Sequence, residues 1–135
     1  MINAGVGNET LVGANSSGAD TFYAGPGNNL IGLGSGPDVV YAGSGATTVL
    51  GGAGKDVMAI VRGTAGGSLT LLGFKPGTDQ LSLQGYAATE AATARAGATK
   101  GAPTATQPAS TTITLSDNTK LTFCGVGSLP TNLFG

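Results

Sequence analysis

Large apolar residues recur with a period of nine in the first sixty positions of the chain. Residues 4–59 divide into six nine-residue units that start at positions 4, 15, 24, 33, 42 and 51, and residues 13–14 are the one interruption. The eighth position of every unit is apolar: Leu11, Phe22, Ile31, Val40, Val49 and Met58. A fixed period of this kind indicates a repeat architecture, in which each unit buries its apolar residue against its neighbours.

Glycine occupies the fourth position of all six units, which predicts a turn in the first part of each unit. Glycine tolerates backbone conformations that residues with a Cβ atom avoid. The last three residues of a unit then form a short strand, which points the eighth residue inward and its two neighbours outward. Two units make one coil of 18 residues, so alternate units stack on the same side. The six units therefore predict a solenoid of about three coils, each about 4.8 Å high.

The period fades after residue 59, and other patterns follow. Residues 68–72 and 80–84 alternate like strands and flank a turn-rich link at 73–79, in which Asp79 is expected to cap a turn or to add one oxygen ligand. Residues 111–115 and 120–124 predict a hairpin around a turn at 116–119. An alanine-rich segment at 87–96 predicts a short helix, and residues 97–110 a low-complexity loop. We divide the chain into repeats at 1–62 and a β-rich cap at 63–135, with the helix and loop at 87–110.

The composition excludes several classes of function. The chain has 135 residues, 25 of them glycine, a net charge of −1 and no histidine. Without a basic patch there is no electrostatic footprint for nucleic acid, and no apolar run is long enough to span a membrane. The start of the chain lacks the basic and apolar regions of an N-terminal signal peptide. The single Cys124 has no histidine partner and no carboxylate pair is suitably spaced, so we expect no enzyme activity.

The six units resemble the glycine-rich nonapeptide repeat of RTX proteins, G-G-x-G-x-D-x-U-x, in which U is a large apolar residue. A glycine-rich dinucleotide-binding turn is the weaker interpretation, because it needs a helix after the glycines and none is predicted here. The resemblance covers residues 4–59. It implies an all-β fold, a parallel β-roll or β-solenoid of about three coils, followed by a C-terminal cap that contains the hairpin and the short helix.

The resemblance also implies Ca²⁺ held between coils by the sixth-position aspartates and by turn oxygens. Asp20, Asp38 and Asp56 are 18 residues apart and fall on one side, so we expect ions between successive aspartates. The candidate metal ligands are Asp20, Asp38, Asp56, Gly18, Gly36, Gly54 and Asn29. Asn29 belongs to the other side, with Glu9 and Thr47, where we expect weak binding or none. The alternative is that the aspartates only cap turns through their side chains.

The outward positions of the repeats are apolar on both faces, which predicts that at least one face is covered. Either the C-terminal half or another subunit could cover it. Exposed solenoid ends also invite edge-to-edge pairing. These features predict a homo-oligomer or a filament that forms through apolar outer faces and solenoid ends.

Residues 129–135 resemble the uncleaved export region of proteins that use type I secretion machinery, and residues 73–83 resemble the segment that commonly follows the repeats in exported RTX-type proteins. The resemblance thus implies a secreted, extracellular or cell-surface structural protein without a signal peptide. One alternative is a surface binding or adhesin module facing ice or carbohydrate, which a regular row of outward threonine or aromatic residues would support. Thr10 with Thr48 and Tyr23 with Tyr41 are the only such pairs evident from the repeats. Another alternative is the export tail of a larger secreted protein.

Overall fold

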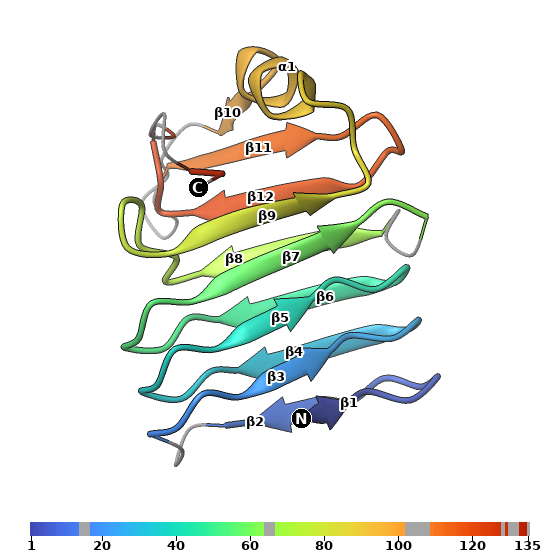
Figure 1. Cartoon of the computed structure of the whole chain (residues 1–135), viewed down its shortest axis with the longest axis vertical. Coiled ribbons are helices and arrows are strands. Elements are labelled where there is room, and N and C mark those ends of the chain that lie inside the picture. The colour runs from blue at the N-terminus through green and yellow to red at the C-terminus, as the bar shows by residue number, and fades with distance from the viewer. Residues whose placement is uncertain (14–16, 64–66, 102–108, 128, 130–132, 135) are drawn as a thin grey trace.

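The computed structural model describes residues 1–13, 17–63, 67–101, 109–127, 129 and 133–134. Its body is a flattened roll of two facing sheets, and the chain passes from one sheet to the other at each turn (Figure 1). We call these sheet A and sheet B. The five strands of sheet A, in spatial order, are β1 (Ile2–Asn3), β3 (Thr21–Tyr23), β5 (Val39–Tyr41), β7 (Val57–Val61) and β9 (Gln80–Gln84).

Sheet B has seven strands and extends further along the roll than sheet A. In spatial order from the N-terminal end they are β2 (Thr10–Val12), β4 (Asn28–Gly32), β6 (Ala46–Leu50), β8 (Ser68–Leu72), β12 (Lys120–Cys124), β11 (Ser110–Thr114) and β10 (Thr99–Gly101). All neighbours from β2 to β12 are parallel, whereas β12–β11 and β11–β10 are antiparallel.

The strand register confirms the 18-residue winding. Phe22 of β3 pairs with Val40 of β5, which pairs with Met58 of β7. The other side repeats the pattern, with Ile31 of β4 paired with Val49 of β6. The predicted parallel β-roll is therefore present, and β8 and β9 add one further coil to the three that the repeats predict. Strand pairing continues across residue 62, and the division of domains there stays a prediction.

The eighth-position residues form the core between the two sheets. Five of the six are buried, and Leu11 at the N-terminal end of the roll is half-buried. Leu69, Leu71 and Leu81 continue the same core into the added coil. Each such side chain contributes about 1.5–3 kcal/mol on leaving water, so the stacked apolar residues hold the two thin sheets together.

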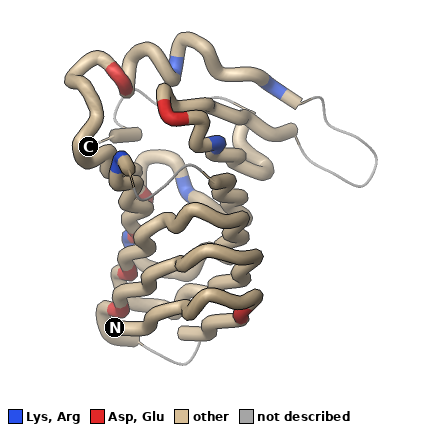
Figure 2. The backbone as a smooth tube through the Cα atoms, turned by 90° about the vertical axis from the view of Figure 1, so that its right-hand side faces the viewer, with Lys and Arg blue, Asp and Glu red and all other residues tan. Residues whose placement is uncertain are grey.

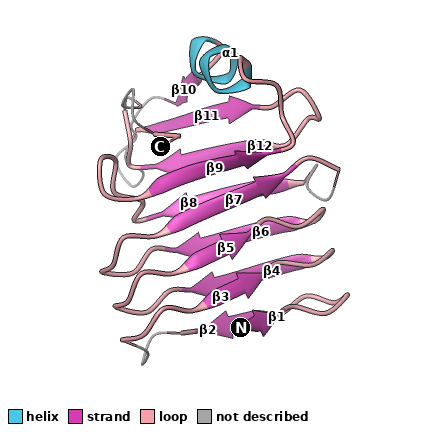
Figure 3. Ribbon diagram, in the orientation of Figure 1, coloured by secondary structure: helices cyan, strands magenta, loops and turns pink. Residues whose placement is uncertain are grey.

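The C-terminal half closes one end of the roll. The predicted strands at 68–72 and 80–84 and the predicted hairpin are all present, and the predicted helix is α1 (Glu90–Ala96) (Figure 3). Oε1 of Glu90 in α1 accepts a hydrogen bond from the amide of Ser116 at 2.7 Å, which fixes the helix to the hairpin turn. The low-complexity loop predicted at 97–110 contains β10, and residues 102–108 lie outside the described residues.

Among the described residues, the C-terminal half does not cover the outer face of sheet B, although it is one of the two covers expected from the sequence. Instead β12, β11 and β10 extend sheet B edge to edge, because their backbones continue the ladder that β8 leaves open. Val12 and Leu50 on the outer face of sheet B consequently keep 62% and 42% of their surface exposed. In the described part of the chain, no helix has the length and apolar character needed to cross a membrane.

Candidate metal centre

The sixth-position aspartates stack in one file along an edge of the roll. Oδ1 of Asp38 accepts a hydrogen bond from the backbone amide of Asp20 at 2.9 Å. Oδ1 of Asp56 accepts one from the amide of Asp38 at 3.0 Å, and Oδ1 of Asp79 one from the amide of Asp56 at 3.0 Å. We call Asp20, Asp38, Asp56 and Asp79 the acidic file. Figure 2 shows acidic positions of successive coils following one edge of the roll.

The second carboxylate oxygen closes the turn to which the aspartate belongs. Oδ2 of Asp38 accepts a hydrogen bond from the amide of Gly34 at 3.0 Å, and Oδ2 of Asp79 accepts one from the amide of Lys75 at 2.8 Å. Both donors lie four residues before the aspartate. The capping role considered as an alternative is therefore real, and it coexists with stacking between coils.

Asp56 departs from this pattern, and its negative charge is the one in the acidic file that the protein stabilises least. Its side chain is 0% exposed, and its Oδ2 atom has no hydrogen-bond partner. The amide of Gly52 is near enough to favour the charged form but does not reach hydrogen-bond geometry with Oδ2. Burial raises the pKa of Asp56, and the negative charges of Asp79 and Asp38 raise it further. No ion pair offsets these charges among the described residues.

The turns beside the acidic file bring carbonyl oxygens close to the next coil. A Cβ atom added to Gly36 would lie 2.1 Å from the carbonyl oxygen of Gly18, and one added to Gly54 would lie 2.0 Å from that of Gly36. Successive turns thus pack backbone against backbone. The predicted ligands Gly18, Gly36 and Gly54 lie in these stacked turns, beside the aspartates that follow them.

The donor set fits a calcium ion and no softer metal. Within the described ranges, no group of three or more histidine, cysteine or acidic side chains could hold a metal ion by itself. A site at the acidic file would need backbone carbonyl oxygens together with Asp38 and Asp56. Calcium accepts such mixed sets of hard oxygen ligands. The buried, unpartnered Oδ2 of Asp56 is the acceptor that a cation there would satisfy.

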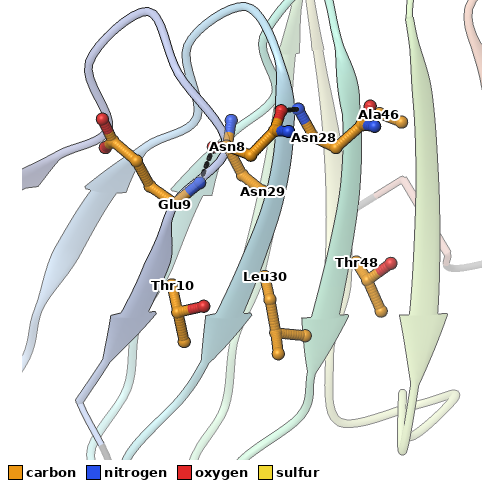
Figure 4. Close-up of a pocket in the computed structure, with 8 residues that line it drawn as sticks. All are labelled: Asn8, Glu9, Thr10, Asn28, Asn29, Leu30, Ala46 and Thr48. Carbon is orange, nitrogen blue, oxygen red and sulfur yellow. Dashed lines mark hydrogen bonds between the residues drawn. The ribbon is translucent and has the colours of Figure 1, made fainter.

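At the opposite edge of the roll, the residues equivalent to the aspartates are neutral in the repeats that follow the first coil. Oδ1 of Asn29 accepts a hydrogen bond from the amide of Glu9 at 3.1 Å, and Oδ1 of Asn8 accepts one from the amide of Asn28 at 2.8 Å (Figure 4). The equivalent Thr47 is buried and its Oγ1 atom has no hydrogen-bond partner. Asn29 therefore lies away from the acidic file, where it closes a turn with neutral hydrogen bonds.

Asp79 is the member of the acidic file that the repeat pattern missed. It follows Asp56 by 23 residues instead of 18, because the link between β7 and β8 is four residues longer than in the repeats and the link between β8 and β9 is one residue longer. The signal was present in the alternating strand that starts directly after it, as in the repeats. Beside this extra turn, the ammonium group of Lys75 donates a hydrogen bond to the carbonyl oxygen of Gly52.

The comparisons with known proteins agree with this geometry. Residues 3–40, 15–49 and 33–58 match the family model described as RTX calcium-binding nonapeptide repeat (4 copies). No curated protein matches the chain. The fold is similar to the solution structure of the AlgE6R3 subunit from the Azotobacter vinelandii mannuronan C5-epimerase, with a TM-score of 0.61 and 16% identity, over 98% of this chain and 80% of that chain. Residues 3–58 of the chain are therefore RTX nonapeptide repeats, wound into a parallel β-roll.

Proposed function

We propose that the chain is a calcium-binding β-roll module whose folding is coupled to binding of the ion at the acidic file. The observation that carries this proposal is the buried Oδ2 atom of Asp56, which has no hydrogen-bond partner. The charges near it, on Asp79 and Asp38, are negative like its own. Asp38, Asp56 and the turn carbonyl oxygens of Gly18 and Gly36 would hold the ion. A bound calcium ion supplies the positive charge that the described residues do not place there.

The coupling follows from where the ligands come from. Asp38 and Asp56 belong to different coils and meet only when the coils stack. An ion that binds the stacked form and not the unfolded chain stabilises it by mass action. We propose that the protein is exported by type I secretion machinery and folds outside the cell, where calcium is more abundant than in the cytosol. This part rests on the RTX resemblance of the repeats and of the C-terminal tail.

Calorimetric titration with calcium tests the proposed site. The wild-type chain should bind calcium, whereas Asp38→Ala should lose most of the binding heat, because Asp38 lies between both predicted ion positions. Asn29→Ala is the matched control, since it removes the equivalent side chain from the opposite edge and should leave calcium affinity unchanged. Equal binding by the wild type and Asp38→Ala would remove the proposed site.

We further propose a structural role through self-association. Within this chain β1 and β2 are edge strands, and each leaves one row of backbone groups unpaired. Such edges pair readily with another chain. At the opposite end of the roll, the last strand of sheet A is β9 and the last strand of sheet B is β10, so sheet B extends further along the roll. This mismatch favours pairing of two N-terminal ends over growth of an open filament, and the exposed apolar outer face of sheet B is the alternative contact surface.

A further inference from the structure

A row of threonines runs across the outer face of sheet B. At one outward position, six of its seven strands carry threonine and β4 carries Leu30, and in-register pairing makes each residue of this row the neighbour of the next. From β2 to β10 the row reads Thr10, Leu30, Thr48, Thr70, Thr122, Thr112 and Thr99. Neighbouring strands are about 4.8 Å apart, so the side chains repeat at that interval.

Burial of the flanking residues places this row on the outer face. Thr70 lies between the buried Leu69 and Leu71, and Thr122 between the buried Leu121 and Phe123. The Oγ1 atoms of Thr112 and Thr122 lie 3.2 Å apart, so side chains from antiparallel β11 also join the row. Figure 4 shows Thr10, Leu30 and Thr48 projecting side by side from successive strands.

The surroundings of the row are apolar on one side and small or polar on the other. The next outward row contains Val12, Leu50 and Leu72, which are exposed. On the other side lie Ala46, Ser68 and Lys120, and Lys120 is the one charged residue in these three rows. None of the residues in these rows is aromatic. Tyr23 and Tyr41, whose stacked rings have centroids 4.8 Å apart, belong to sheet A.

We propose that the outer face of sheet B binds the surface of ice. Each threonine presents a methyl group and a hydroxyl group, which together hold water in fixed positions without the strong hydration shell of a charge. The strand spacing of about 4.8 Å lies close to the shortest repeat of water oxygens in the lattice of hexagonal ice. The in-register ladder keeps this repeat from β6 to β11 without a slip. A crystalline polysaccharide fits this face less well than ice does. Proteins bind such polysaccharide surfaces through flat rows of aromatic side chains, and this face has no aromatic residue.

Incorporation into slowly growing ice tests this proposal, with the wild-type chain in calcium-containing buffer and a non-binding protein as the reference solute. The wild type should be enriched in the ice fraction, and Thr48→Tyr combined with Thr70→Tyr should return it to the level of the reference. Thr70→Val keeps the shape but removes a hydroxyl group, and it should reduce incorporation in part. Thr21→Tyr is the matched control, because Thr21 projects from the outer face of sheet A.

Circular dichroism spectra and sedimentation of each variant keep the outcomes distinct. Exclusion of a folded wild-type chain from ice would overturn the proposal. Loss of incorporation by Thr21→Tyr as well would also overturn it, because the effect would then not belong to this face. A shift from dimer to monomer in the double variant, with no change in ice incorporation, would identify a second copy of the chain as the occupant. The inference does not rest on calcium binding. A folded chain that does not bind calcium but is incorporated into ice would therefore refute only the proposed function.

Discussion

At the scale of single residues, the acidic file contains two kinds of aspartate. Asp38 has a backbone donor for each carboxylate oxygen, so its charge is satisfied within the protein. Asp56 has a donor for Oδ1 alone, and its Oδ2 atom is buried without a partner. Leaving a buried acceptor unsatisfied costs about 1–3 kcal/mol, and more if the group is charged. The same residue therefore weakens the calcium-free roll, and under the proposed function it is the acceptor that a bound cation would satisfy.

Asp56→Asn should stabilise the protein in the presence of a chelator and weaken its response to calcium. The amide oxygen can keep the hydrogen bond from the Asp38 amide, while the buried charge disappears. Asp38→Asn is the informative contrast, because its new amide group would face the N–H group of Gly34 and should destabilise the roll by about 1–3 kcal/mol. Urea unfolding of both variants in chelator measures the difference, and a less stable Asp56→Asn would contradict this account.

The stability of the calcium-free protein should depend on pH through Asp56. Burial, followed by the charges of Asp79 and Asp38, raises the pKa of Asp56 above its ordinary value of 3.8. A carboxyl group with a raised pKa in the folded state binds its proton more tightly there, so its stabilising contribution is present at low pH and lost as pH rises through the folded pKa. In chelator, the urea midpoint should therefore rise as pH falls from neutral towards the ordinary carboxyl range.

Calcium should reverse this trend, because the ion binds the ionised carboxylate. The wild-type chain with calcium should lose stability over the same fall in pH, and Asp56→Asn should show little dependence in chelator.

The pKa of Asp117 is lowered despite its burial, since Tyr86 and Thr119 donate hydrogen bonds to it. Its contribution is lost only as pH falls below the ordinary carboxyl range, outside this window. Identical pH profiles for wild type and Asp56→Asn would rule out Asp56 as the source.

At the scale of turns and strands, glycine is required where one coil touches the next. Gly36→Ala should destabilise the roll by about 1–3 kcal/mol or more, because the added Cβ atom would overlap the backbone of Gly18. Gly32→Ala is the control, since nothing lies within 4 Å of a Cβ atom there and the position is a strand end. That variant should be neutral or more stable by about 0.4–1 kcal/mol. Equal urea midpoints for the two variants would refute tight stacking of the turns.

The nine-residue period predicts the elements formed by the repeats, and pairing between distant segments limits what it reveals of the rest. The inward residues, the 18-residue coil and the alignment of Asp20, Asp38 and Asp56 all follow from local spacing. The parallel pairing of β12 with β8 does not, because the two strands are separated by about fifty residues and by α1. For the same reason the repeats reveal only Thr10 and Thr48 of the threonine row, whereas Thr112 and Thr122 join it through the hairpin.

At the scale of the whole molecule, the roll has one closed end and one open end. Sedimentation velocity should show reversible, concentration-dependent dimers of the calcium-loaded chain, because β1 and β2 offer unpaired edges and Leu11 is half-buried there. Leu11→Glu should shift the equilibrium to monomer by placing a charge at that end. Val12→Lys, on the outer face of sheet B, should leave it unchanged. Dimers that respond to Val12→Lys and not to Leu11→Glu would assign the contact to the outer face.

The central claim is that calcium binding at the acidic file and folding of the roll are one process. Urea unfolding of the wild-type chain at increasing calcium concentration tests it most directly. The free energy of unfolding should rise with the logarithm of calcium concentration once the site is saturated, by about 1.4 kcal/mol for each tenfold increase per bound ion. A midpoint that is the same in calcium and in chelator would contradict the account.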